Sequence, residues 1–171
     1  MTEALDDRDA AMYAWRKANV DQLNNLARQR WRDAGRLAGP ELAAAGGRHF
    51  AAGDWIVTLA PGKRGKLVTS ERGVVERVEP HNSALVARMD DGRLVRLWGE
   101  ELNAHRLAHG YATTGHRAQG ANVDVAHRFE DGGGRELAYV AMSRARERST
   151  AWVVADDLEQ ACEDLMRGVV H

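Results

Sequence analysis

The sequence has 171 residues, enough for one sizeable domain or for one domain with a small insertion. Hydrophobic residues make up 44% and charged residues 29%, as in ordinary soluble globular proteins. The formal net charge is -1, so the charge of the whole chain does not indicate a nucleic-acid-binding protein, and any basic surface must be local. Cys162 is the only cysteine, which excludes an intramolecular disulfide and fits a reducing compartment.

No targeting or metal-binding pattern is evident. Residues 1–9 are acidic and lack the apolar core of a signal peptide, and no apolar run approaches the length of a membrane span. We therefore expect a cytoplasmic protein with no membrane partner. His105 and His109 are four residues apart, but no third ligand accompanies them, so no metal site is predicted.

The first part of the chain predicts a strand followed by a helix. The apolar run 10–15 is typical of a buried strand. Apolar side chains then recur at helical spacing over residues 20–37, and Gly39-Pro40 is expected to end the helix. Residues 41–47 are expected to form a linker.

The pattern changes between residues 49 and 102. Short apolar runs separated by turn residues predict four strands, at residues 53–59, 73–78, 84–88 and 94–98. Asp91-Gly92 between the last two runs is a hairpin signal. Short strands at this spacing favour a small β-barrel, which we interpret as SH3-like.

The last third returns to alternating strands and helices. The expected elements are a strand at 123–129, a helix at 135–147, a strand at 150–155 and a helix at 158–167. A barrel between two α/β segments indicates an insertion. We therefore predict one α/β parallel-sheet domain, built from residues 1–48 and 103–171, that carries an SH3-like barrel at 49–102.

No loop for ATP phosphates is found. Such a loop ends in Gly-Lys-Ser/Thr, and the nearest candidate, Gly62-Lys-Arg-Gly-Lys66, has the wrong spacing and is followed by Leu67 instead of a hydroxyl. Gly132-Gly-Gly134 could meet an anion at a helix N-terminus, but a plain strand-to-helix connection is the favoured interpretation.

Arg144 lies beside the apolar face of the helix expected over 135–147, three residues after Ala141. A guanidinium at the edge of a core needs a partner. One explanation is a salt bridge to Asp156 or Glu136. The other is an arginine finger that binds the γ-phosphate of a nucleotide across a cleft.

The string from Tyr139 to Arg146, Tyr-Val-Ala-Met-Ser-Arg-Ala-Arg, is similar to motif VI of superfamily 1 helicases of the RecD-like and UvrD-like groups. In that family the arginine after Ser or Thr contacts the γ-phosphate, which implies this role for Arg144.

The string from Thr114 to Gly120, Thr-Gly-His-Arg-Ala-Gln-Gly, resembles motif V of the same helicases. The resemblance implies that Thr114 and His116 hold the backbone of single-stranded DNA, as suits hydroxyl and imidazole groups. Arg117 belongs to the same group of DNA contacts.

The end of motif V is expected to face the nucleotide. The resemblance assigns Gln119 and Gly120 to the turn at the ATP cleft. Two residues later this chain has Asn122, where the family often has Glu or Thr near the ribose or phosphates.

The string from Tyr13 to Asn24 resembles motif IV, in which a strand delivers an arginine to the γ-phosphate. Arg16 matches that arginine. The resemblance therefore implies that Arg16 and Arg144 converge on one phosphate and stabilise the charge that develops during phosphoryl transfer.

The order of motif IV, barrel, motif V and motif VI is most similar to the C-terminal helicase portion of conjugative relaxase-helicases of the TrwC/TraA type, whose barrel also begins with a Phe-x-x-Gly-Asp pattern, here Phe50 to Asp54. The chain would then be the second RecA-like domain of a DNA helicase. ATP and Mg²⁺ would act in the full-length parent, and the chain alone would bind no cofactor tightly. Its partners would be single-stranded DNA and an N-terminal RecA-like domain that this sequence lacks.

Two alternatives stay open at this point. The chain could be a non-enzymatic nucleic-acid- or protein-binding module, a remnant of a helicase. The barrel could also be a protein-interaction site, with the α/β part as its scaffold.

Overall fold

The computed structural model describes residues 9–62, 67–118 and 122–170. These residues form two compact units, one built from the chain up to Ala27 and from Tyr111 onward, the other from Arg28–Gly110. The predicted division at 1–48, 49–102 and 103–171 stays a prediction. No helix in the described part of the chain is long and apolar enough to cross a membrane.

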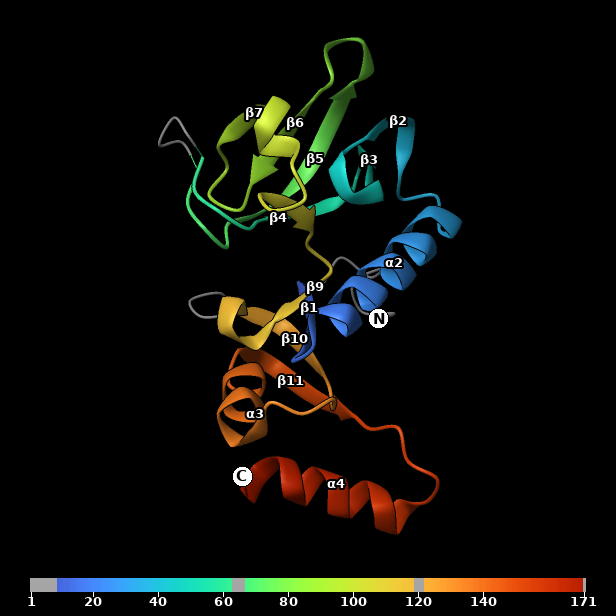
Figure 1. The fold of residues 1–171 in the computed structure, drawn as a ribbon, viewed down its shortest axis with the longest axis vertical. Helices are drawn as coiled ribbons and strands as arrows, with labels where there is room; N and C mark the ends of the chain where they lie inside the picture. Colours follow the sequence, from blue (N-terminus) through green and yellow to red (C-terminus); the bar gives the residue numbers. More distant parts are fainter. Residues whose placement is uncertain (1–8, 63–66, 119–121, 171) are drawn as a thin grey trace. The chain divides into compact units, whose positions relative to one another are not determined.

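The first unit contains a parallel sheet. Its strands follow the spatial order β11-β10-β1-β9, and every neighbouring pair is parallel (Figure 1). The strands are β1 (Ala10–Ala14), β9 (Ala112–Thr114), β10 (Val123–Phe129) and β11 (Ala145–Trp152). The predicted α/β fold with a parallel sheet is confirmed.

Helices α2 (Lys17–Asp33) and α3 (Gly134–Met142) cover opposite faces of this sheet. Val20 of α2 packs with Ala14 of β1, whereas Val140 of α3 packs with Ala11 and Tyr13. Successive strand residues face opposite sides, so β1 is covered on both faces, as expected for an α/β domain.

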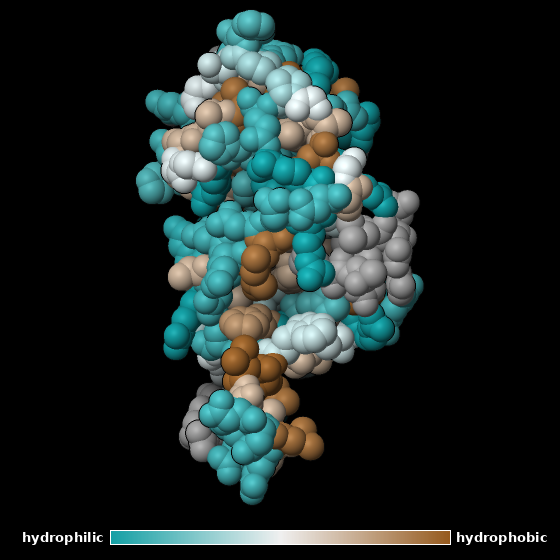
Figure 2. Space-filling view, turned by 90° about the vertical axis from the view of Figure 1, so that its right-hand side faces the viewer, coloured by the Kyte–Doolittle hydropathy of each residue, from teal (hydrophilic) through white to brown (hydrophobic). Residues whose placement is uncertain are grey.

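Helix α4 (Leu158–Val170) follows β11 through a short connection. Trp152, Val154 and Leu158 are exposed there, and Figure 2 shows the apolar surface where this segment meets α4.

The helix ends that differ most from the sequence-based expectation are the carboxyl ends of α2 and α3. The helix predicted to reach residue 37 ends at Asp33, because Gly35 adopts a left-handed conformation with φ of 67° and the Arg36 N–H donates to the Trp31 carbonyl. The helix predicted over 135–147 ends at Met142, and its last predicted residues belong to β11.

The second unit contains a five-stranded antiparallel sheet in the order β7-β6-β5-β4-β8, beside the antiparallel pair β2-β3. The strands are β2 (Ala38–Ala43), β3 (His49–Ala52), β4 (Trp55–Thr58), β5 (Arg72–Glu79), β6 (Ala84–Met89), β7 (Leu94–Trp98) and β8 (Leu107–His109). Their inward side chains form one apolar core that includes Phe50, Leu85 and Leu97.

The hairpin predicted at Asp91-Gly92 is confirmed. It joins β6 to β7, and Gly92 has a φ of 84° that suits a residue without a Cβ. The linker predicted at 41–47 is wrong, because β2 pairs with β3 there. That the sheet is an SH3-like barrel stays a prediction.

The Phe-x-x-Gly-Asp pattern has a structural role. Phe50 is fully buried in the core, and the Asp54 carboxylate accepts hydrogen bonds from the Arg28 Nε, at 3.0 Å to each oxygen, and from the Ala51 N–H at 2.7 Å. Asp54 has no exposed side-chain surface, so the pairing with Arg28 keeps a buried charge compensated.

Candidate functional site

The motif V residues begin at the carboxyl end of β9. Thr114 is the last residue of this strand, lies beside Ala14 of β1 in the parallel register and is half-buried. The chain then forms a short 3-10 turn, Gly115–Ala118, that contains His116 and the half-buried Arg117. The side chain of His116 is outside the described part of the structure.

The other end of motif V returns to the amino end of β10. The predicted nucleotide contacts Gln119 and Gly120 lie outside the described residues. Asn122 is exposed and directly precedes Val123, the first residue of β10. An exposed amide at the end of this loop is free to meet a ligand, so the geometry is compatible with the predicted contact.

Arg144 lies in the turn between α3 and β11, not on the helix as predicted. Its carbonyl accepts a hydrogen bond of 3.0 Å from the Val123 N–H. This bond places the backbone of the motif VI arginine beside the residue that follows Asn122, although the two are more than twenty positions apart in the sequence. Arg144 and Asn122 therefore lie at the amino edge of the sheet, whereas Thr114, the first residue of the motif V string, lies at its carboxyl edge.

The Arg144 guanidinium is partly buried, and its Nε has no hydrogen-bond partner among the described residues. The salt bridge to Asp156 that could have explained it is absent from this part of the chain, and the side chain of Glu136 is not described. A buried, unsatisfied N–H of a permanent cation is costly, so this atom would gain from an anionic ligand.

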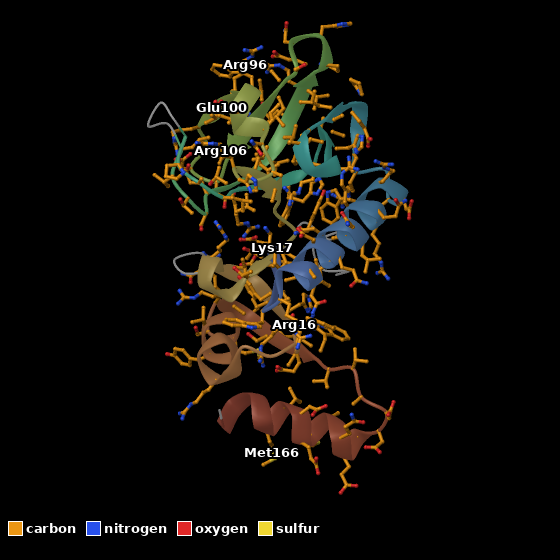
Figure 3. The ribbon with its side chains drawn as sticks, viewed as in Figure 1. Arg16, Lys17, Arg96, Glu100, Arg106 and Met166 are labelled. Atoms are coloured by element: carbon orange, nitrogen blue, oxygen red, sulfur yellow. The ribbon has the colours of Figure 1, made fainter. Side chains whose placement is uncertain are left out.

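Arg16 lies at the other edge of the sheet. It follows β1, is exposed, and its backbone N–H donates to the Asp131 carboxylate at 2.9 Å (Figure 3). Asp131 follows β10, whereas Arg144 bonds to the first residue of that strand, and the seven residues of β10 span about 20 Å. The structure therefore does not bring Arg16 and Arg144 together.

Two polar residues that the sequence did not single out support these segments. The Asp131 carboxylate accepts hydrogen bonds from the Trp15 N–H at 2.7 Å, the Arg16 N–H and the Asn19 side chain at 2.7 Å. It therefore holds the turn that carries Arg16. The Asn24 side chain forms two hydrogen bonds with the backbone of Ala112 in β9. No local signal in the sequence suggests either role, because the partners of both residues are far away in the sequence.

His109, Trp55 and Trp98 have partners within the second unit. The His109 Nε2 lies 2.9 Å from the His49 carbonyl oxygen, and no group of potential metal ligands occurs among the described residues. Trp55 and Trp98 are half-buried, each with an arginine guanidinium over its ring.

The sequence was compared with known proteins. No protein-family model matches it. It is 38% identical over 141 residues to conjugal transfer protein TraA of Agrobacterium fabrum, and 37% identical over 138 residues to the probable conjugal transfer protein TraA of Sinorhizobium fredii. Each match covers 77% of this chain, and the chain spans only 12% of the length of either relative.

The fold resembles solved Pif1 structures. Bacteroides Pif1 bound to ssDNA matches 92% of this chain with a TM-score of 0.59 and 18% identity, over 45% of its own length. Pif1 helicase from Candida albicans matches 88% with a TM-score of 0.53 and 14% identity, over 46% of its own length. At these identities the likeness shows the fold alone.

Proposed function

We propose that this chain, which belongs with the TraA-type conjugal transfer proteins and has the fold of a superfamily 1 helicase, is the second RecA-like domain of an ATP-dependent DNA helicase. The parent protein would move along single-stranded DNA at the expense of ATP. A first RecA-like domain would supply the phosphate loop and the carboxylate that holds Mg²⁺. The similar proteins support this: the relatives are conjugal transfer proteins, and one structural match is a Pif1 helicase in complex with ADP-AlF3 and ssDNA.

One observation carries the proposal. The hydrogen bond between Val123 and Arg144 joins the motif V and motif VI segments, and the Arg144 Nε beside it is buried without a partner in the described structure. Arg144 would place its guanidinium against the γ-phosphate, where it stabilises the charge of the transferring group. Gln119, Gly120 and Asn122 would line the nucleotide from the same edge.

Arg16 is the proposed second γ-phosphate contact. Because it lies at the carboxyl edge of the sheet and Arg144 at the amino edge, the two arginines cannot contact one phosphate in this arrangement, and an Arg16→Ala variant tests the role of Arg16 separately.

The DNA contacts would lie where β9 ends. Thr114, His116 and Arg117 would bind the sugar-phosphate backbone, which is how a protein without base specificity holds a single strand. The second unit would guide the strand as it leaves.

Binding of a fluorescent oligo-dT to the isolated chain, followed by anisotropy, tests the DNA contacts. We expect binding that weakens as salt rises, because phosphate contacts release counterions. The Thr114→Ala/His116→Ala variant should bind about tenfold more weakly or worse, since each lost hydrogen bond contributes about 1 kcal/mol.

Thr113→Ala is the matched control, because this neighbouring threonine is equally half-buried but faces the other side of β9. Equal losses in both variants, or no binding by the unaltered chain at low salt, would contradict the proposal. The chain would then fit better as a non-enzymatic remnant of a helicase.

A further inference from the structure

Strand β9 lies at the edge of the parallel sheet, with β1 on one side only. On its open side the Asn24 side chain bonds to the strand backbone. Asn24 of α2 donates its Nδ2 hydrogen to the Ala112 carbonyl at 3.0 Å and accepts the Ala112 N–H on its Oδ1 at 2.9 Å. Asn24 is only 4% exposed and Ala112 only 2%.

These two hydrogen bonds take the place of the bonds that a neighbouring strand would form with Ala112. In a parallel sheet the N–H and carbonyl of one residue point to the same side, so an edge residue leaves both without a partner. A carboxamide offers one donor and one acceptor at the spacing of a peptide group. Water cannot readily substitute at a buried position, so the alternative is two unsatisfied backbone groups.

The helix that carries Asn24 is itself fixed near its start. The Asn19 side chain and the backbone N–H groups of Trp15 and Arg16 all bond to the Asp131 carboxylate, beyond the end of β10. Val20 of the same helix packs against Ala14 and Ala112. The helix that carries Asn24 is thus fixed by contacts of its own, so the position of Asn24 does not depend only on its bonds to β9.

We infer that Asn24 is a positioning residue for the contacts to single-stranded DNA. It fixes Ala112, two residues before Thr114 in a strand of only three residues, and so sets the place and direction in which Thr114 and the following turn meet the DNA backbone. This inference rests on the proposed function, because it concerns the same DNA contacts. Asn24 itself touches no DNA.

The first test is the Asn24→Leu variant, which keeps the size of the side chain and removes both hydrogen bonds. We expect oligo-dT to bind roughly fivefold more weakly, the range of indirect effects on a binding site. Asn24→Asp, which keeps the shape and the acceptor for the Ala112 N–H, serves if the leucine variant does not fold. Circular dichroism and a denaturation curve establish folding for each.

A double-mutant cycle separates positioning from general loss of stability. If Asn24 positions Thr114, the Thr114→Ala/His116→Ala change should cost much less binding in the Asn24 variant than in the unaltered chain. Val75→Ala is the control, since it removes packing from the buried core of the other unit and should leave the cost unchanged.

The possible outcomes distinguish failure of the positioning role from failure of the proposed function. A folded Asn24 variant that binds oligo-dT as well as the unaltered chain, or losses that simply add, would contradict the positioning role and leave the proposed function standing. No binding by the unaltered chain would contradict the proposed function and this inference with it.

Discussion

His109 and Asp54 are titratable groups held inside the second unit. His109 is 4% exposed, and its ring lies against Phe50 with 4.8 Å between centroids. Burial lowers the pKa of His109, because the charged imidazolium loses its hydration. The hydrogen bond to the His49 carbonyl and the nearby Asp54 carboxylate act in the opposite direction but do not overcome burial.

This depressed pKa predicts acid sensitivity. The unfolded chain takes up a proton at His109 near pH 6.5, whereas the folded protein resists it to lower pH. The contribution of neutral His109 to the free energy of unfolding is therefore fully present above about pH 6.5. It is lost as the pH falls from there toward the pKa of His109 in the folded protein. Urea denaturation at pH 7.5 and pH 5.5 should show a smaller free energy of unfolding at the lower pH.

His109→Gln should remove part of that difference, because glutamine does not titrate. His81→Gln is the control, since His81 is exposed and near a turn. If the glutamine variant at position 109 kept the full pH dependence, His109 would not be its source.

The buried polar contacts could not be predicted from the sequence. Asn24 bonds to a residue 88 positions away, and Asp54 to one 26 positions away. Hydrophobic periodicity identifies which face of a helix is buried, but it carries no information about which distant backbone group a polar residue meets. The strings that resemble helicase motifs, by contrast, could be recognised in the sequence because their residues are adjacent.

At the level of elements, Asp131 connects the end of β10 with the start of α2. The first N–H groups of a helix lack partners within the helix, and its N-terminus attracts negative charge. Arg16 directly precedes α2, and the Asp131 carboxylate accepts its N–H at this end of the helix. The same carboxylate also accepts the Trp15 N–H and a hydrogen bond from the Asn19 side chain. Asp131 is therefore an N-terminal cap of α2 that comes from the segment after β10.

We expect Asp131→Ala to lower the free energy of unfolding by about 1 kcal/mol, the usual cost of a lost helix cap. Asp33→Ala at the other end of α2 is the control, since Asp33 is exposed and bonds to Gln29. Chemical denaturation followed by circular dichroism measures both. Equal effects of the two changes would contradict a specific role for Asp131.

The elements that the sequence predicted well are those with strong local signals. The strands at 10–14, 84–89, 94–98 and 123–129 lie within one residue of their predicted bounds, because each is a compact apolar run with clear flanks. Strands β2, β3, β8 and β9 were not predicted. Strands β8 and β9 have three residues each and pair with strands far away in the sequence, and β2 contains Gly39-Pro40, which was interpreted as the end of a helix. The end of α3 was missed because Ala145 fits a helical face as well as a strand.

At the level of the whole molecule, the proposed nucleotide site would be formed only in part by this chain. Leu67, which stands where a phosphate loop would have its hydroxyl, is buried in the apolar core of the second unit, so its side chain serves packing. In the proposed role Arg144 would stabilise a γ-phosphate, and this needs a nucleotide that another set of residues holds together with Mg²⁺. Arginine fingers act in this way on a site that lies mainly elsewhere.

The isolated chain should therefore hydrolyse no ATP above background, measured as phosphate release with Mg²⁺ and oligo-dT present. Arg144→Ala should leave this background unchanged. Arg146→Ala is the neighbouring control, because Arg146 is exposed and pairs with Asp124 at 3.2 Å. A Mg²⁺-dependent rate that Arg144→Ala abolishes and Arg146→Ala preserves would show a complete catalytic site within the chain, and the proposal that a first RecA-like domain must supply the phosphate loop would be wrong.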